Sequence, residues 1–192
     1  ADAAALAAYL AKAPAGEPLA VDAVTAGGPP EPVIATIGLY HPVAGEAIVE
    51  CGGPTLDSLV SPSAAARPAA PALPQSADNR LDRAAMVIAA LGERTLVGHD
   101  VKALIEWWLA RGGALPPAED TAVAAYLLNP ARTNYKLEEV CAELLGQGPG
   151  IARPGTRARW IWDLWAMEPR AMEEVGLHAL YQDVERPLIG VL

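Results

Sequence analysis

Phenylalanine is absent from the 192 residues, so five tryptophans and five tyrosines supply all of the aromatic bulk. Cysteine is nearly absent, and Cys51 and Cys141 lie far apart, outside any C-x-x-C pair. This spacing argues against a zinc site or a redox pair and favours two buried thiols. The histidines, His41, His99 and His178, are equally scattered. The sequence therefore predicts no cysteine- or histidine-based metal cluster.

Positive charge is also scarce, with 14 Lys and Arg against 23 Asp and Glu and a net charge of −9. This balance disfavours a free-standing nucleic-acid binder, which carries a basic face; it is compatible with DNA contacts on an attached neighbour. No apolar run is long enough to cross a bilayer, so we expect no membrane partner. The chain does not begin with Met, and we expect it to be a piece of a longer protein.

What is present is enough apolar material for one domain with a core, since 52% of the residues are hydrophobic. The alanine-rich start, 1–16, carries Asp2 where a signal peptide has positive charge, and it predicts a short helix ended at Pro14. Three segments rich in Val and Ile follow, and they predict an antiparallel meander: 19–27, 31–42 and 45–51. The Pro/Ala-rich stretch 52–78 predicts an extended connector.

The second half changes to helical periodicity. We expect a helix over 81–91, a short strand over 94–99 and a helix over 101–109. Asp120 and Asn134 are each expected to cap a further helix, and the tail after residue 156 reads as helical. The sequence thus places strands first and then one strand among several helices. This order predicts a mixed α/β fold with a small sheet.

The first predicted strand, LAVDAVTAG (19–27), carries one carboxylate, Asp22, among apolar residues. A buried carboxylate is costly without a partner, and one reason to keep it is a metal. A D-x-E pair places both carboxylates on one side of a strand, because side chains alternate with period two. Here the second position is Val24. The simpler alternative is an Asp at a strand end that accepts a bond from a backbone N–H.

Three stretches then match a known family. The segment 97–146, with "EDTAVAAYLLNP" and "NYKLEEVCAELLG", resembles the 3′–5′ exonuclease domain of bacterial DNA polymerase I, a family A polymerase. The end, "LYQDVERPLIGVL" (180–192), is similar to the helix that leads into the polymerase domain. The resemblance implies an α/β, ribonuclease H-like fold with about five strands. It also implies an exonuclease-like domain over 1–180 and, over 181–192, the start of the helix that enters a polymerase domain.

In active members of that family, a D-x-E pair, an Asp early in a later helix and a late Tyr-x-x-x-Asp hold two divalent metals. Such ions activate a water and stabilise the leaving oxygen of a phosphodiester. Carried over by position, the resemblance matches Asp22 to the first carboxylate and places Val24, Leu104 and Thr156 at the other three. It therefore implies degenerate motifs and no metal in this region. We also expect Leu104 to fill the old cleft, and Asp22 to be left uncompensated with a raised pKa.

Two other carboxylates offer an alternative set of ligands. Asp100 lies one turn before Leu104, and Asp163 lies in "RWIWDLW". The simpler interpretation makes Asp100 a helix cap and places Asp163 in solvent.

Three hypotheses follow. The first is a catalytically inactive exonuclease-like domain that supports a DNA polymerase I, and the second is a metal-dependent 3′–5′ exonuclease with rearranged ligands. The third is a non-cleaving nucleotide or single-strand binding module, whose candidates are Arg153, Arg157 and Arg159 with Trp160 and Trp162. A solvated helix face over buried Trp is the simpler interpretation of these residues. The resemblance implies DNA replication and repair in the cytoplasm, at the nucleoid. It implies an attached polymerase domain, DNA contact through the parent enzyme, no cofactor here and Mg²⁺ for the polymerase domain.

Overall fold

The structure is a computed structural model that describes residues 3–26, 33–51, 86–87, 89–91, 94–109, 117–146 and 152–191. The predicted connector at 52–78 lies outside these residues. So does the first part of the predicted helix at 81–91, of which residues 86, 87 and 89–91 are helical.

A five-stranded sheet forms the centre of the molecule, in the order β3-β2-β1-β4-β5. The predicted meander is confirmed, because β1 (Leu19–Ala26), β2 (Val33–His41) and β3 (Gly45–Glu50) pair antiparallel in sequence order. β4 (Leu96–Gly98) lies parallel to β1, and β5 (Ala118–Asp120) lies parallel to β4 at the sheet edge. The sequence did not predict β5, because three residues carry no readable period.

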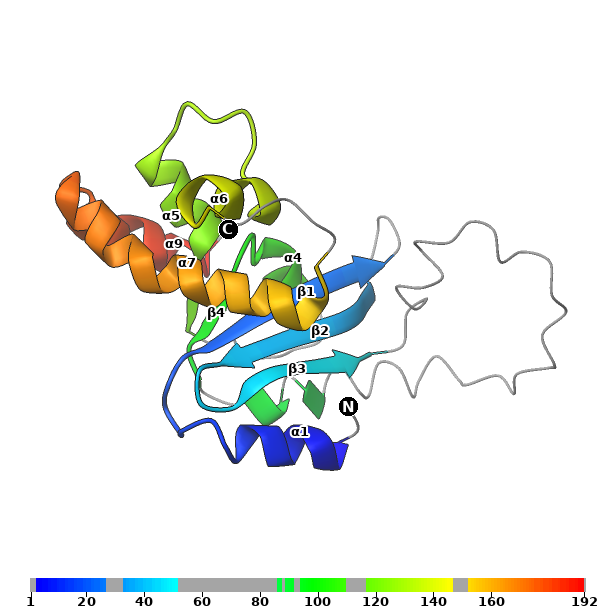
Figure 1. Cartoon of the computed structure of the whole chain (residues 1–192). Coiled ribbons are helices and arrows are strands. Elements are labelled where there is room, and N and C mark those ends of the chain that lie inside the picture. The colour runs from blue at the N-terminus through cyan, green and yellow to red at the C-terminus, as the bar shows by residue number, and fades with distance from the viewer. Residues whose placement is uncertain are drawn as a thin grey trace, which may run out of the picture.

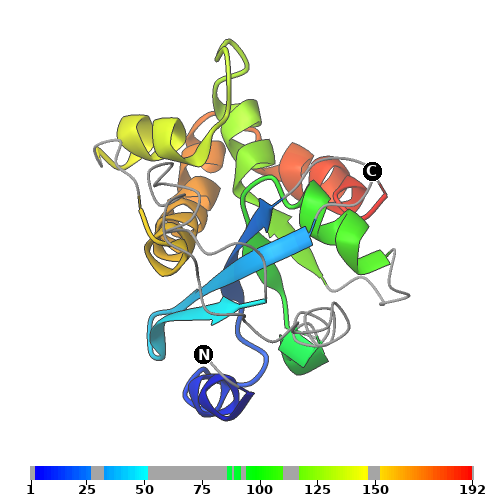
Figure 2. The same cartoon turned by 90° about the vertical axis from the view of Figure 1, so that its right-hand side faces the viewer.

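Helices cover both faces of this sheet (Figures 1 and 2). α7 (Pro154–Glu174) lies across one face, over the meander strands, together with α5 (Thr121–Leu128) and α6 (Leu137–Leu144). α1 (Ala3–Leu10) and α4 (Lys102–Leu109) pack on the other face. A C-terminal helical segment follows α7 and consists of α8 (His178–Leu180), the π-helix η1 (Tyr181–Glu185) and α9 (Arg186–Leu188).

The alternation of side chains along β1 separates the two largest of the four core clusters among the described residues. Leu19 and Val21 pack with residues of α1 and α4. Ala20 points the other way and packs with Ala158, Ile161 and other residues of α5, α6 and α7. Because strand side chains alternate, Asp22 shares the face of Ala20, so it points toward α7.

α7 approaches the sheet closely at Gly38 of β2. A Cβ atom at Gly38 would lie 2.0 Å from the carbonyl oxygen of Pro154. Only glycine leaves room for backbone at this distance. This contact fixes the N-terminal end of α7 above the strand that pairs with Asp22.

One predicted helix cap is confirmed and the other is wrong. Asp120 is the N-cap of α5, and its carboxylate accepts a hydrogen bond from the backbone N of Ala122 at 2.8 Å. Asn134 does not cap α6, whose N-cap position is Lys136. Its Oδ1 atom accepts instead from the backbone N of Lys136 at 3.2 Å. Asn side chains often bond the backbone two residues on and form a turn rather than a cap.

Candidate functional site

Asp22 lies in the middle of β1 and is 8% exposed. Its Oδ2 atom accepts a hydrogen bond from Nε of Arg157 on α7 at 2.9 Å. Nη1 of Arg157 also donates to Oε1 of Glu138, in the first turn of α6. The expectation that Asp22 is left uncompensated is therefore wrong, because α7 crosses the face of β1 to which Asp22 points and brings Arg157 to it.

Burial nevertheless raises the pKa of the Asp22 carboxyl, as expected, and the positive charge of Arg157 only partly offsets this rise. Removing the carboxylate from water outweighs its single ion pair, because desolvation disfavours the charged form. The Asp22 carboxylate is thus paired with a cation, but its ionised form is still disfavoured by burial.

A cavity of about 450 Å³ opens beside this ion pair. It is lined by residues of β1, of the turn from β4 into α4, of the first turns of α4, α5 and α6, of the segment just before α6, and by Arg157 of α7. It carries both signs of charge, from the side chains of Asp22, Asp100, Lys136, Glu138 and Arg157. The site is therefore a mixed-charge cleft.

The expectation that Leu104 fills this cleft is wrong. Leu104 is buried in the core cluster on the opposite face of the sheet, with Trp107 and Trp108. Its neighbour Ala103 lines the cavity instead. The apolar stripe of α4 turns Leu104 inward, and a methyl group is too small to close the cleft.

The other two positions carried over from the family place no carboxylate at the cavity either. Val24 is half-buried on β1, next to a register shift between Val24 and Thr25. Oγ1 of Thr156 lies 3.4 Å from Oε2 of Glu46, to which it donates. In the part of the chain that the structure describes, no group of three or more His, Cys, Asp or Glu is arranged to hold a metal ion. With Asp22 bonded to a guanidinium, the residues present do not fit a two-metal centre.

Of the two alternative ligands, the structure brings Asp100 to the cavity but not Asp163. Asp100 is exposed and has a left-handed backbone with φ of 55°. The carboxylate of Asp120 accepts the backbone N–H groups of Asp100 at 2.9 Å and of Val101 at 3.0 Å. Asp120 therefore accepts hydrogen bonds from the backbone N–H groups that precede α4. The sequence predicts this capping role for Asp100, and that prediction is wrong. Asp163 is half-buried and faces Arg159 on the same helix at 3.9 Å.

His99 is a site residue that the sequence did not single out. Nε2 donates to the carbonyl oxygen of Tyr135 at 2.6 Å, and Nδ1 lies 2.7 Å from Oγ1 of Thr121. Burial lowers the pKa of His99, which favours the neutral ring. Both ring nitrogens are thus engaged in joining α5 to the segment before α6. The sequence feature that could have identified His99 is its position directly after the buried strand β4.

Only one of the three candidate arginines reaches the cavity. Arg153 is exposed at the N-cap position of α7. Arg159 is also exposed, and its guanidinium carbon lies 6.0 Å from the ring centroid of Tyr40. Trp162 packs against Tyr40 and Trp165, with ring centroids 6.2 and 5.1 Å apart. Tyr40, Trp162 and Trp165 are partly buried against the core cluster under α7, and none of them is among the residues that line the cavity.

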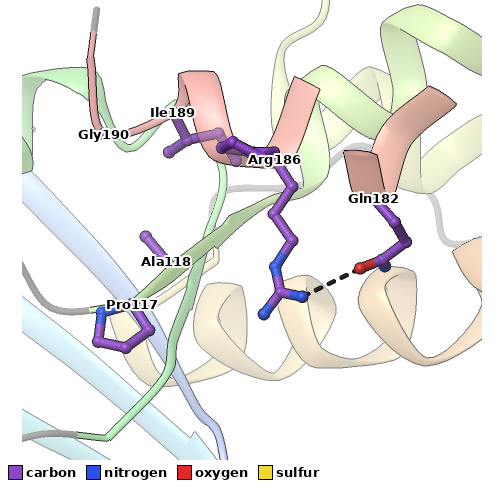
Figure 3. Close-up of a pocket in the computed structure, with 7 residues that line it drawn as sticks. Pro117, Ala118, Gln182, Arg186, Ile189 and Gly190 are labelled. Carbon is purple, nitrogen blue, oxygen red and sulfur yellow. Dashed lines mark hydrogen bonds between the residues drawn. The ribbon is translucent and has the colours of Figure 1, made fainter. Parts of the chain in front are cut away.

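A second cavity, of about 440 Å³, lies between the start of β5 and the C-terminal helical segment (Figure 3). Its lining is mostly apolar, with Pro117, Pro187 and Ile189 among its residues. Arg186 reaches across its wall and donates to Oε1 of Gln182 at 3.0 Å (Figure 3). The Nε atom of Arg186 is held by Oε1 of Glu119 at 2.8 Å. Because Arg186, the charged residue that lines this cavity, is already paired with Glu119, we assign the cavity no catalytic or binding role.

No protein-family model matches this sequence. A curated protein, DNA polymerase I of Deinococcus radiodurans, is 32% identical over 102 residues, which are 53% of this chain and 10% of that protein. This chain resembles DNA polymerase I. The matched part of this chain thus covers about a tenth of the length of that DNA polymerase I.

Two solved structures share its fold. The POL domain of Pol1 from M. smegmatis, in complex with DNA primer-template and dNTP, has a TM-score of 0.64 and 17% identity, and the match covers 94% of this chain and 28% of that one. Brucella melitensis NrnC with bound Mg²⁺ has a TM-score of 0.62 and 14% identity, and the match covers 91% of this chain and 82% of that one. The likeness in fold and the mixed five-stranded sheet with helices on both faces confirm the predicted fold class. Among the described residues no helix is both long and apolar enough to span a membrane.

Proposed function

We propose that this chain is a catalytically inactive 3′–5′ exonuclease-like domain that supports a DNA polymerase I structurally. One observation carries the proposal: Asp22, the carboxylate that matches the first metal ligand of the family, is bonded at 2.9 Å to Arg157. A phosphodiesterase of this type needs several carboxylates free to hold two cations. A carboxylate that is bound to a guanidinium is not free to do so.

The enzymatic alternative has one observation in its favour, because Asp100 and Glu138 line the same cavity as Asp22. These could serve as rearranged ligands if Arg157 moved away. The binding-module alternative has less support, since Arg157 is already engaged with two carboxylates. Lys136 is the other basic residue among those that line the cavity.

A nuclease assay separates the first two hypotheses. The 192-residue chain is incubated with 5′-labelled single-stranded and mismatched DNA in Mg²⁺ or Mn²⁺. We expect no shortening of the labelled strand above the level of the matched variant Asp22→Ala. Metal-dependent shortening of the labelled strand that Asp22→Ala abolishes would refute the proposal and establish the enzyme.

The supporting role gives the C-terminal helical segment a partner. Tyr181 and Ile189 of this segment are buried against the domain, whereas Leu180, Val184 and Leu188 are exposed on its other side. Exposed apolar side chains at helical spacing are typical of a contact surface. We propose that this segment is the start of the helix that enters an attached polymerase domain, and that it packs there. DNA, Mg²⁺ and a cytoplasmic, nucleoid-associated location would then belong to the parent enzyme.

A further inference from the structure

Arg157 connects three elements of the fold through a single side chain. It is carried by α7, its Nε bonds Asp22 of β1, and its Nη1 bonds Glu138 of α6. The Arg157 side chain is 25% exposed, against 9% for Asp22 and 32% for Glu138. The pair with Asp22 is therefore largely withdrawn from water, and the pair with Glu138 lies closer to the surface.

Without Arg157, the carboxylates of Asp22 and Glu138 would face one cavity without the cation that both now bind. Like charges at short range repel, and the repulsion grows as water is withdrawn. A guanidinium suits this position because its planar fork presents several N–H donors in fixed directions and keeps its charge at all accessible pH values. It can bind one carboxylate with Nε and a second with Nη1, as it does here.

A divalent cation would need the same oxygens. Hard cations such as Mg²⁺ and Mn²⁺ bind carboxylate oxygens, and both Asp22 and Glu138 already direct an oxygen at Arg157. A positive charge fixed between them also repels an approaching cation. The cleft thus holds a cation already, but one that is covalently part of the chain.

We propose that Arg157 is a tethered cation that replaces a divalent metal ion between Asp22 and Glu138 and closes this cleft to metals. The inference rests on the proposed loss of nuclease activity and deepens it. It assigns the loss to a specific residue that took over the charge of the metal, in addition to the missing carboxylates. Arg157 is accordingly a structural residue of the site.

The test is Mn²⁺ binding, measured by calorimetry and as a shift of melting temperature. Arg157→Ala exposes both carboxylates, so we expect its Mn²⁺ affinity to exceed that of the wild type by at least tenfold. Its melting temperature, lower than that of the wild type without metal, should rise in Mn²⁺. The double variant Arg157→Ala/Asp22→Asn should lose the gain. The matched control is Arg159→Ala, because Arg159 is on the same helix but outside the cleft, and it should bind Mn²⁺ no better than the wild type.

Arg157→Gln keeps a long side chain without the charge, and it replaces Arg157→Ala if that variant does not fold. The proposal is overturned if the folded variant gains no Mn²⁺ affinity, or if the wild type binds Mn²⁺ in a manner that Asp22→Asn abolishes. These outcomes are distinct from failure of the proposed function, which is read from DNA cleavage. A wild type that binds Mn²⁺ through Asp22 without cutting DNA would overturn the tethered cation alone. A wild type that cuts DNA while Arg157→Ala still gains a separate Mn²⁺ site would overturn only the inactivity.

Discussion

Glu168 is the most deeply buried carboxyl group on α7, at 2% exposure. Its Oε1 atom has no hydrogen-bond partner among the residues that the structure describes. Burial raises the pKa of Glu168 well above 4.5, and the negative charges of Asp120 and Glu119 raise it further. The folded protein therefore keeps this carboxyl protonated at a pH where the unfolded chain has ionised it.

This difference makes stability depend on pH with a definite sign. Below about 4.5, the ordinary value, the carboxyl is protonated in both states and Glu168 has no effect of this kind. As the pH climbs from there to the raised folded-state pKa, the unfolded chain releases a proton that the fold retains, so the free energy of unfolding falls. One proton gives a limiting slope of about 1.4 kcal/mol per pH unit.

Glu168→Gln removes the ionisation while keeping the size of the side chain. We expect it to match the wild type near pH 4 and to exceed its free energy of unfolding at pH 7 by up to about 3.5 kcal/mol, because a slope of about 1.4 kcal/mol per pH unit can act over no more than the interval from 4.5 to 7. Urea denaturation at intervals from pH 4 to pH 8 gives the difference between the two forms at each pH. Glu173→Gln, an exposed position on the same helix, is the control and should show a flat difference. Parallel curves for Glu168→Gln and the wild type would refute the reasoning.

Two further substitutions test the contacts that position the cleft. Gly38→Ala places a Cβ atom 2.0 Å from the Pro154 carbonyl oxygen, so thermal denaturation should show a loss of about 1–3 kcal/mol in the free energy of unfolding. The control is Gly155→Ala, whose Cβ meets Glu46 at 3.3 Å and which should lose less stability. Equal losses in the two variants would contradict the close approach of α7. Asp120→Ala removes the acceptor of three backbone N–H groups. It should lower the free energy of unfolding in urea by about 2–3 kcal/mol, and an Asp120→Ala variant as stable as the wild type would contradict this role.

Local patterns in the sequence were sufficient for most of the fold. The meander follows from Val- and Ile-rich runs between turn formers, and the α5 cap follows from Asp120 before an apolar helix. The site depends on contacts between distant residues: Arg157 reaches Asp22 across 135 positions, and no local pattern encodes that approach. The sequence around Arg157 therefore indicates only nucleic-acid contact or a solvated helix face. The second role of Asp120, before α4, was missed for the same reason.

Asp22 and Glu168 show that α7 handles two buried carboxyl groups in different ways. Asp22 has a cation within 2.9 Å, and its charged form is partly supported. Glu168 has two acidic neighbours, Glu119 and Asp120, and among the described residues it has no ion-pair partner. Glu119 itself is already committed, since its carboxylate accepts from the Tyr181 hydroxyl at 2.8 Å and pairs with Arg186. Protonation is then the remaining way to keep Glu168 inside. The two ends of α7 should accordingly respond to different perturbations. Stability near Asp22 depends on the positive charge of Arg157, whereas stability near Glu168 depends on a bound proton.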